Sequence, residues 1–165
     1  MVARSHRQAV QAALLIGLLA CPVSAQEPVN KAADYVSWAT AGANATGAIV
    51  EAIRSDDTKC HLARLAISEA IGMGAAFTFQ HLIVSPRPCL GCAPNGWPSA
   101  HVTQSVLGST ASAKRLTWGF SVGVAVGTAE GRDRAHRHTR AQQAAGMVFG
   151  SLAELAGQKL LRCRE

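Results

Sequence analysis

Apolar side chains recur at intervals of three and four residues along most of this chain, which is the period of an amphipathic helix. Clusters of charged residues and turn formers separate these stretches. The stretch 116–129 is uncharged and contains β-branched residues, but its length and its helical neighbours favour a buried helix over a strand. The pattern predicts helices over 30–54, 60–84, 99–113, 116–129 and 138–161.

The segment 85–98 interrupts this pattern. It contains four prolines and two glycines, which exclude a helix and predict a long ordered loop or lid. Ser99 follows the last of these prolines and is a good N-cap for the next helix.

Composition supports one helical domain. The chain has 165 residues, of which 48% are hydrophobic and only 5% aromatic, and this is typical of close-packed helices with small contact residues. We therefore expect an all-α fold, a compact bundle of about five helices. The formal net charge is +6, so a basic function would depend on where the arginines gather.

The first 25 residues have the features of an export signal. Arg4 and Arg7 form a basic start, an apolar run follows over 12–20, and Val23-Ser24-Ala25 fits a signal peptidase site. This assigns 1–25 to a signal peptide and 26–165 to a single helical domain, in the periplasm or secreted. A lipoprotein signal ending at Cys21 is the alternative.

Four cysteines remain after removal of this leader, and an even number in an oxidising compartment predicts disulfides. Three pairings are possible. We favour Cys89 with Cys92, inside one loop, and Cys60 with Cys163, which would tie the start of one helix to the end of the chain. A redox pair or half a zinc site is the alternative for Cys89 and Cys92.

Two of the three segments with candidate chemistry flank the proline-rich loop. Arg87 offers a planar fork of donors that matches phosphate oxygens, and Pro88 stiffens the backbone that presents it. Ser99 and Ala100 begin a helix, where unpaired backbone N–H groups favour an anion. His101 beside that anion could donate a proton to a departing alkoxide.

The third segment, 131–140, has four arginines and two histidines. It could be a solvated basic loop, but nucleic acid is excluded as a partner by the export signal and by the lack of interleaved aromatic residues. Arg132, His138 and Gln142 are spaced by six and four residues. On a helix, Gln142 would lie one turn from His138 and could orient its imidazole as a nucleophile.

Together these segments resemble the type 2 phosphatidic acid phosphatase and vanadium haloperoxidase superfamily. That family has Lys, six residues, Arg-Pro; then Pro-Ser-Gly-His; then Ser-Arg, five residues, His, three residues, Asp. The similarity extends over 80–146 and includes Gly146, whereas His136 in place of the nucleophile would lose the arginine spacing. The resemblance implies a phosphohistidine mechanism without a metal or other cofactor. His138 would attack phosphorus, His101 would protonate the leaving oxygen, and Arg87, Arg132 and the Ser99 region would bind the other oxygens.

Three residues depart from the family pattern: Gln80 stands in place of Lys, Ala100 in place of Gly, and Gln142 in place of Asp. The phosphate-binding set would still include Gln80 and Ala100, and Arg134, Arg137 or Arg140 could supply the missing cation. Gln142 can orient His138 but cannot stabilise its positive charge. Asp133 and Glu69 are the acids expected nearby.

These residues predict an exported phosphatase that hydrolyses a phosphomonoester or a lipid pyrophosphate. Its partner would be a phosphorylated small molecule or lipid head group, with peripheral membrane contact if the substrate is a lipid. The alternative is a degenerate family member that binds phosphate without efficient turnover. A vanadate haloperoxidase fits less well, because its larger helical framework exceeds this chain.

Overall fold

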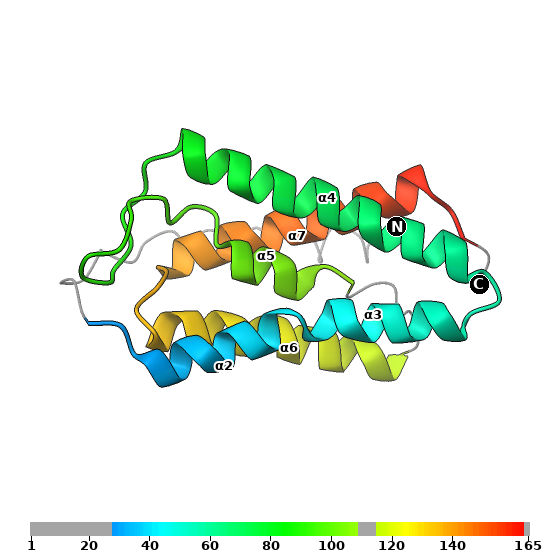
Figure 1. Cartoon of the computed structure of the whole chain (residues 1–165), viewed down its shortest axis with the longest axis horizontal. Coiled ribbons are helices and arrows are strands. Elements are labelled where there is room, and N and C mark those ends of the chain that lie inside the picture. Colours follow the sequence, from blue (N-terminus) through cyan, green and yellow to red (C-terminus); the bar gives the residue numbers. More distant parts are fainter. Residues whose placement is uncertain (1–27, 109–114, 164–165) are drawn as a thin grey trace, which may run out of the picture.

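A computed structural model of the chain describes residues 28–108 and 115–163 (Figure 1). The predicted signal peptide, its expected cleavage site and Cys21 lie outside these residues. The expected all-α bundle is confirmed, with no strand in the described ranges. Its helices are α2 (Lys31–Ala41), α3 (Ala43–Arg54), α4 (Thr58–Leu82), α5 (Ala100–Val106), α6 (Arg115–Arg134) and α7 (Arg140–Leu160).

The helices pack as two pairs, and the two helices of each pair are antiparallel. Helix α4 lies along α7, α2 lies along α6, and the short helix α5 lies between these two pairs and contacts both (Figure 1). The C-terminal ends of α4 and α6 and the N-terminal ends of α2, α5 and α7 lie at one end of the bundle, on the left of Figure 1. Segments that are distant in sequence therefore meet there.

The stretch 30–54 forms two helices instead of the one expected. Helix α2 ends at Ala41, and Gly42 serves as both its C-cap and the N-cap of α3. The Asn44 side chain that follows is buried, and its Nδ2 donates to the carbonyls of Ser105 and Ser121 at 2.5 and 3.1 Å. The break lets one polar side chain join α3 to α5 and α6.

Helix α5 is shorter than predicted, because it ends at Val106 and not near 113. Gly108 follows with φ +83°, a left-handed conformation that favours glycine, and an added Cβ would lie 2.9 Å from the Ala48 Cβ. The buried Glu154 of α7 accepts the Gly108 backbone N–H through Oε2 at 3.0 Å. Residues 109–114 lie outside the described part of the chain.

The basic segment differs from the expected loop. Helix α6 continues to Arg134, so Arg132 lies in its last turn, and α7 begins only at Arg140. His138 precedes the Thr139 N-cap, so it is not one helical turn from Gln142 within α7. Thr139 and Gln142 instead form a reciprocal capping box, in which each side chain bonds the other residue's backbone N–H.

Both favoured disulfides are confirmed. Cys60, near the start of α4, is bonded to Cys163, and Cys89 is bonded to Cys92 within the proline-rich loop. The first bond closes the bundle end opposite the loop, and the second constrains the loop itself.

Helix α4 is the one helix in the described ranges that is long and apolar enough to cross a membrane, by length and composition alone. Core helices of soluble proteins meet the same criterion. In α4, however, only 22% of the apolar 18-residue stretch is buried. In the bundle, α4 contacts α3, α5 and α7.

Candidate functional site

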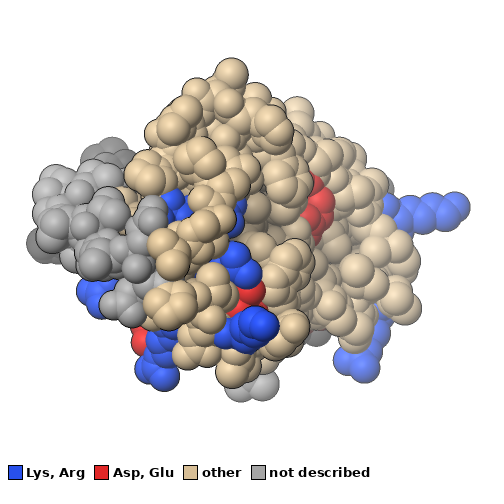
Figure 2. All heavy atoms as spheres, turned by 60° about the vertical axis from the view of Figure 1, so that its left-hand side comes forward, with Lys and Arg blue, Asp and Glu red and all other residues tan. Residues whose placement is uncertain are grey.

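The candidate site lies at the bundle end where the proline-rich loop meets the starts of α2, α5 and α7 and the end of α6. Figure 2 views this end and shows Lys and Arg side chains gathered on it, with acidic side chains among them. The three segments singled out from the sequence meet here.

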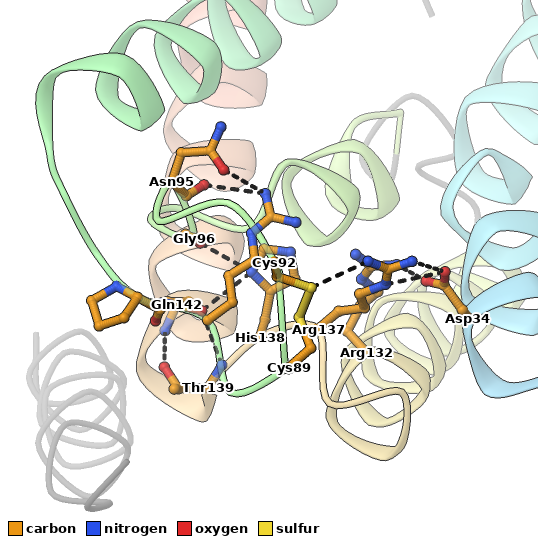
Figure 3. The surroundings of a disulfide bond; sticks show 12 residues. Asp34, Cys89, Cys92, Asn95, Gly96, Arg132, Arg137, His138, Thr139 and Gln142 are labelled. Carbon is orange, nitrogen blue, oxygen red and sulfur yellow. Dashed lines mark hydrogen bonds and ion pairs between the residues drawn. A yellow bond between two sulfur atoms is a disulfide. The ribbon is translucent and has the colours of Figure 1, made fainter. Parts of the chain in front are cut away.

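His138 is almost completely buried, with a relative exposure of 1%. Its Nδ1 lies 3.0 Å from the Gly96 carbonyl oxygen and 3.3 Å from Gln142 Oε1 (Figure 3). Both neighbours are acceptors, which assigns the proton to Nδ1 and leaves the lone pair on Nε2. Within the described ranges, Nε2 makes no hydrogen bond. This is the tautomer that a nucleophilic imidazole requires.

Gln142 ties the proline-rich loop to the start of α7. Its Oε1 also accepts the Thr139 backbone N–H at 3.0 Å, while Nε2 donates to Ser85 Oγ at 2.9 Å and to the Pro86 carbonyl at 2.8 Å. These four partners fix which way the amide faces. Gly96 packs directly against this amide, since an added Cβ would lie 2.4 Å from Nε2.

The loop presents Arg87, whose Nη2 donates to both the carbonyl and the side-chain oxygen of Asn95 at 3.2 Å. At the end of the loop, the Ser99 backbone N–H donates to the Gln142 carbonyl at 2.9 Å. Gly146 allows this close approach, because its added Cβ would lie 2.6 Å from the Ser99 carbonyl oxygen. Loop, α5 and α7 are thus fixed relative to one another.

Gln80 and Ala100 have supporting positions. Gln80 is buried at the end of α4, and its Nε2 donates to the Pro98 carbonyl at 2.7 Å, just before Ser99. Ala100 is buried at the first position of α5. The Gln80 amide therefore positions the backbone at the start of α5 and does not supply the charge of a lysine.

His101 lies on α5 with its ring edge-on to the indole of Trp38 on α2, at a centroid separation of 4.0 Å. Its Nε2 is buried and has no partner in the described ranges. A buried polar atom without a hydrogen-bond partner destabilises the fold unless a ligand or another group bonds to it.

Asp34 is the site residue that the sequence analysis missed. It forms an ion pair with Arg132 through Oδ1 and another with Arg137 through Oδ2, the latter at 2.7 Å (Figure 3). Asp34 shares the inward face of α2 with the buried Ser37 and Ala41, and a charged residue on that face was the available signal.

Other residues considered from the sequence lie elsewhere. Arg134 and Arg140 are 71% and 60% exposed and pair with Glu130 and Asp133. Glu69 instead accepts a hydrogen bond from Gln104 at 2.8 Å. The acid beside the arginines is therefore Asp34, and neither Asp133 nor Glu69 fills that place.

The site has an excess of positive charge. Among the described residues, Asp34 pairs with Arg132 and Arg137 and acts electrostatically on Arg87, so one carboxylate meets three arginines and leaves two uncompensated charges if both imidazoles are neutral. Burial, followed by the charge of neighbouring arginines, lowers the pKa of Arg87 and lowers that of Arg132 to about 10. Burial would raise the pKa of Asp34, but the Arg137 hydrogen bond and the charges of both arginines outweigh it and lower that pKa.

The same environment favours the neutral form of both imidazoles. Burial, and then the charge of Arg132, lowers the pKa of His101 to about 4. Burial lowers the pKa of His138 well below its ordinary value, with Arg132, Arg87 and His101 adding to the effect. The charges of Arg87 and Arg132 thus act on both histidines.

Unpartnered polar atoms concentrate in this site. Six buried side-chain nitrogen or oxygen atoms in the described ranges have no hydrogen-bond partner, and four of them belong to residues proposed from the sequence. These four atoms are Arg87 Nε, Ser99 Oγ, His101 Nε2 and Arg132 Nε. Three can act as donors in any state, so the arrangement is suited to bind an oxyanion.

No protein-family model, curated protein or solved structure matches this chain.

Proposed function

We propose that the protein is a phosphatase that hydrolyses a phosphomonoester or a lipid pyrophosphate through a phosphohistidine intermediate. The observation that carries this proposal is the set of four buried, unpartnered polar atoms on Arg87, Ser99, His101 and Arg132. A phosphoryl group has acceptor oxygens for the guanidinium and hydroxyl donors. Its two negative charges would balance the charge excess of the site.

In the first step, the Nε2 lone pair of His138 attacks phosphorus and forms an N–P bond. The bond between phosphorus and the ester oxygen breaks, its electron pair stays on that oxygen, and His101 protonates it. Arg87 and Arg132 hold the oxygens that remain on phosphorus. Preorganised donors of this kind are often worth about 3 kcal/mol each in the transition state.

In the second step, the oxygen of a water molecule attacks phosphorus, and neutral His101 accepts a proton from that water. The N–P bond breaks and its electron pair returns to His138 Nε2. The products are an alcohol, or the corresponding phosphate from a pyrophosphate, and inorganic phosphate.

His101 must be protonated for the first step, although its pKa in the free protein is lowered to about 4. A bound dianion opposes the arginine charges that contribute to this shift and so raises the pKa. Binding of the substrate dianion would therefore draw a proton onto His101, where the leaving oxygen needs it.

The rim of the site supports an apolar leaving group. Trp38, which packs on His101, is 61% exposed, and Leu82, Val84 and Leu90 are also exposed on the neighbouring helix end and loop. A lipid at a bilayer surface would cover such side chains. With the leader over 1–25, the reaction would take place in the periplasm or outside the cell.

The test is a phosphatase assay on purified protein 26–165 with para-nitrophenyl phosphate and a lipid pyrophosphate. We expect turnover in the wild-type protein and its loss in His138→Ala. His136→Ala is the matched control and should keep activity, because His136 lies in the turn before Arg137 and does not contribute to the shifted pKa values of the site. Equal activity in both variants would contradict the proposal.

A phosphate-binding protein without efficient turnover is the second candidate. The observation that favours it is the amide of Gln142 beside His138, where a carboxylate would stabilise an imidazolium. Vanadate binding in the absence of turnover on either substrate would support this candidate over the enzyme.

A further inference from the structure

We infer that Arg137 is a third oxyanion-binding side chain of this site and that Asp34 holds it in position. The inference rests on the proposed function and adds a residue to it. Of the arginines in the basic segment, Arg137 has this role, and Arg134 and Arg140 do not.

The contacts of Arg137 place it beside the buried site. Its Nε and Nη2 lie 3.1 and 2.7 Å from Asp34 Oδ2, while Arg132 takes the other oxygen of the same carboxylate (Figure 3). Because the Asp34 carboxylate binds both guanidinium groups, Arg137 lies next to Arg132, which is only 2% exposed. Its backbone N–H also donates to the Arg132 carbonyl at 3.0 Å.

The charge of Arg137 acts on the other site residues. It contributes to the lowered pKa values of Arg87, Arg132 and His101, and to that of Asp34. An anion bound among those groups would therefore also be attracted by Arg137.

Arg137 also has a donor that its present partners use poorly. Asp34 accepts from Nε and Nη2, but Nη1 lies 3.4 Å from Cys92 Sγ, and sulfur is a weak acceptor. The side chain is 29% exposed. It can therefore reach a phosphate oxygen from the outer edge of the site, while Arg132 binds from the inner side.

This arrangement supplies a cation that Gln80 does not. The Gln80 amide is neutral and already donates a hydrogen bond to the Pro98 carbonyl. Arg137 supplies a positive charge from the turn between α6 and α7, where it pairs with Asp34.

Titration calorimetry of the purified protein with orthovanadate and with inorganic phosphate tests the inference. We expect Arg137→Gln to weaken both affinities by about tenfold or more, because a charge-assisted contact is lost. Arg134→Gln is the matched control. It removes the same charge from the same segment at a side chain that is 71% exposed, and it should change affinity by less than about twofold.

Equal affinities in the two variants, with wild-type binding intact, would overturn the role of Arg137 and leave the proposed function standing. If the wild-type protein binds neither anion, the proposed function fails and this inference with it. If circular dichroism shows that Arg137→Gln does not fold, Arg137→Lys replaces it. That variant keeps the charge but loses the planar fork, so affinity should fall by about threefold, and an unchanged affinity would overturn the inference.

Discussion

The Gly96 carbonyl oxygen lies 3.0 Å from Nδ1 of His138. A backbone carbonyl thus holds the imidazole in the tautomer that exposes Nε2, and the neighbouring Gln142 oxygen supports it. Neither oxygen carries a full negative charge. His138 is therefore oriented, but its protonated form, and the phosphorylated form of the proposed mechanism, would lack the stabilisation that a carboxylate gives.

Gln142→Glu tests this relationship. The new carboxylate should raise the pKa of His138 and move the acidic limb of the activity profile to higher pH. It also replaces the donor that faces the Pro86 carbonyl with an acceptor, which should cost about 1–3 kcal/mol of folding stability. The measurements are kcat/KM against pH and urea unfolding. An unshifted profile together with unchanged stability would show that Gln142 does not contact His138.

Asp34→Asn tests the shared ion pair. Removal of one partner of a buried pair leaves Arg132 without its counter-ion, which should cost about 3–5 kcal/mol of stability. Asp34 also positions Arg137, so its loss should weaken anion binding, and orthovanadate should raise Tm less in the variant than in the wild type. A larger vanadate effect in Asp34→Asn would contradict the positioning role of Asp34. Asp133→Asn, whose contact with Arg140 is 3.9 Å and partly exposed, is the control.

Folding stability should fall as pH decreases from about 6.5 towards 4. Over this range the unfolded chain protonates His101 and His138, while the folded protein, in which both pKa values are lowered, does not. The slope is at most about 1.4 kcal/mol per pH unit for each histidine. His101→Gln should remove about half of it in chemical denaturation between pH 4.5 and 6.5. The same slope in that variant would show that His101 is protonated in the native site. Asp34, with its lowered pKa, adds a loss only below about 4.

The two disulfides should have separable effects. Cys60 and Cys163 are 103 residues apart, so their replacement by serine should cost about 4–5 kcal/mol of stability and leave phosphate affinity intact in the folded protein. Cys89 and Cys92 are three residues apart, so their replacement should cost only about 2 kcal/mol. It should nevertheless weaken phosphate binding, because this bond constrains the loop that presents Arg87. Calorimetry on both pairs of variants compares the two, and the reverse order of effects would contradict this division.

The helical class was accessible from the sequence. Apolar periodicity located the helices, and the spacing of His138 and Gln142 identified two side chains whose Nδ1 and Oε1 atoms lie 3.3 Å apart. The boundaries were less accessible, because Gly42 ends α2 where tertiary contacts of Asn44 favour a new helix, which periodicity does not show. His138 was placed on a helix, whereas the Thr139 cap puts it just before one.

The identity of the acid in the site could not be read from local spacing. Asp34 is distant from both arginines in sequence, and only the packing of α2 on α6 brings them together. The choice among Arg134, Arg137 and Arg140 depended likewise on the path of the turn between α6 and α7.

The Asp34 ion pairs also determine when the site can form. They join positions 98 and 103 residues apart, and contacts of such long range form late, because a large loop must close first. A chain growing from its N-terminus exposes α2 long before it contains either arginine. Assembly of the charged centre therefore waits until synthesis has passed the turn before α7, and a shortened product that ends before this turn would contain Arg132 but neither Arg137 nor His138.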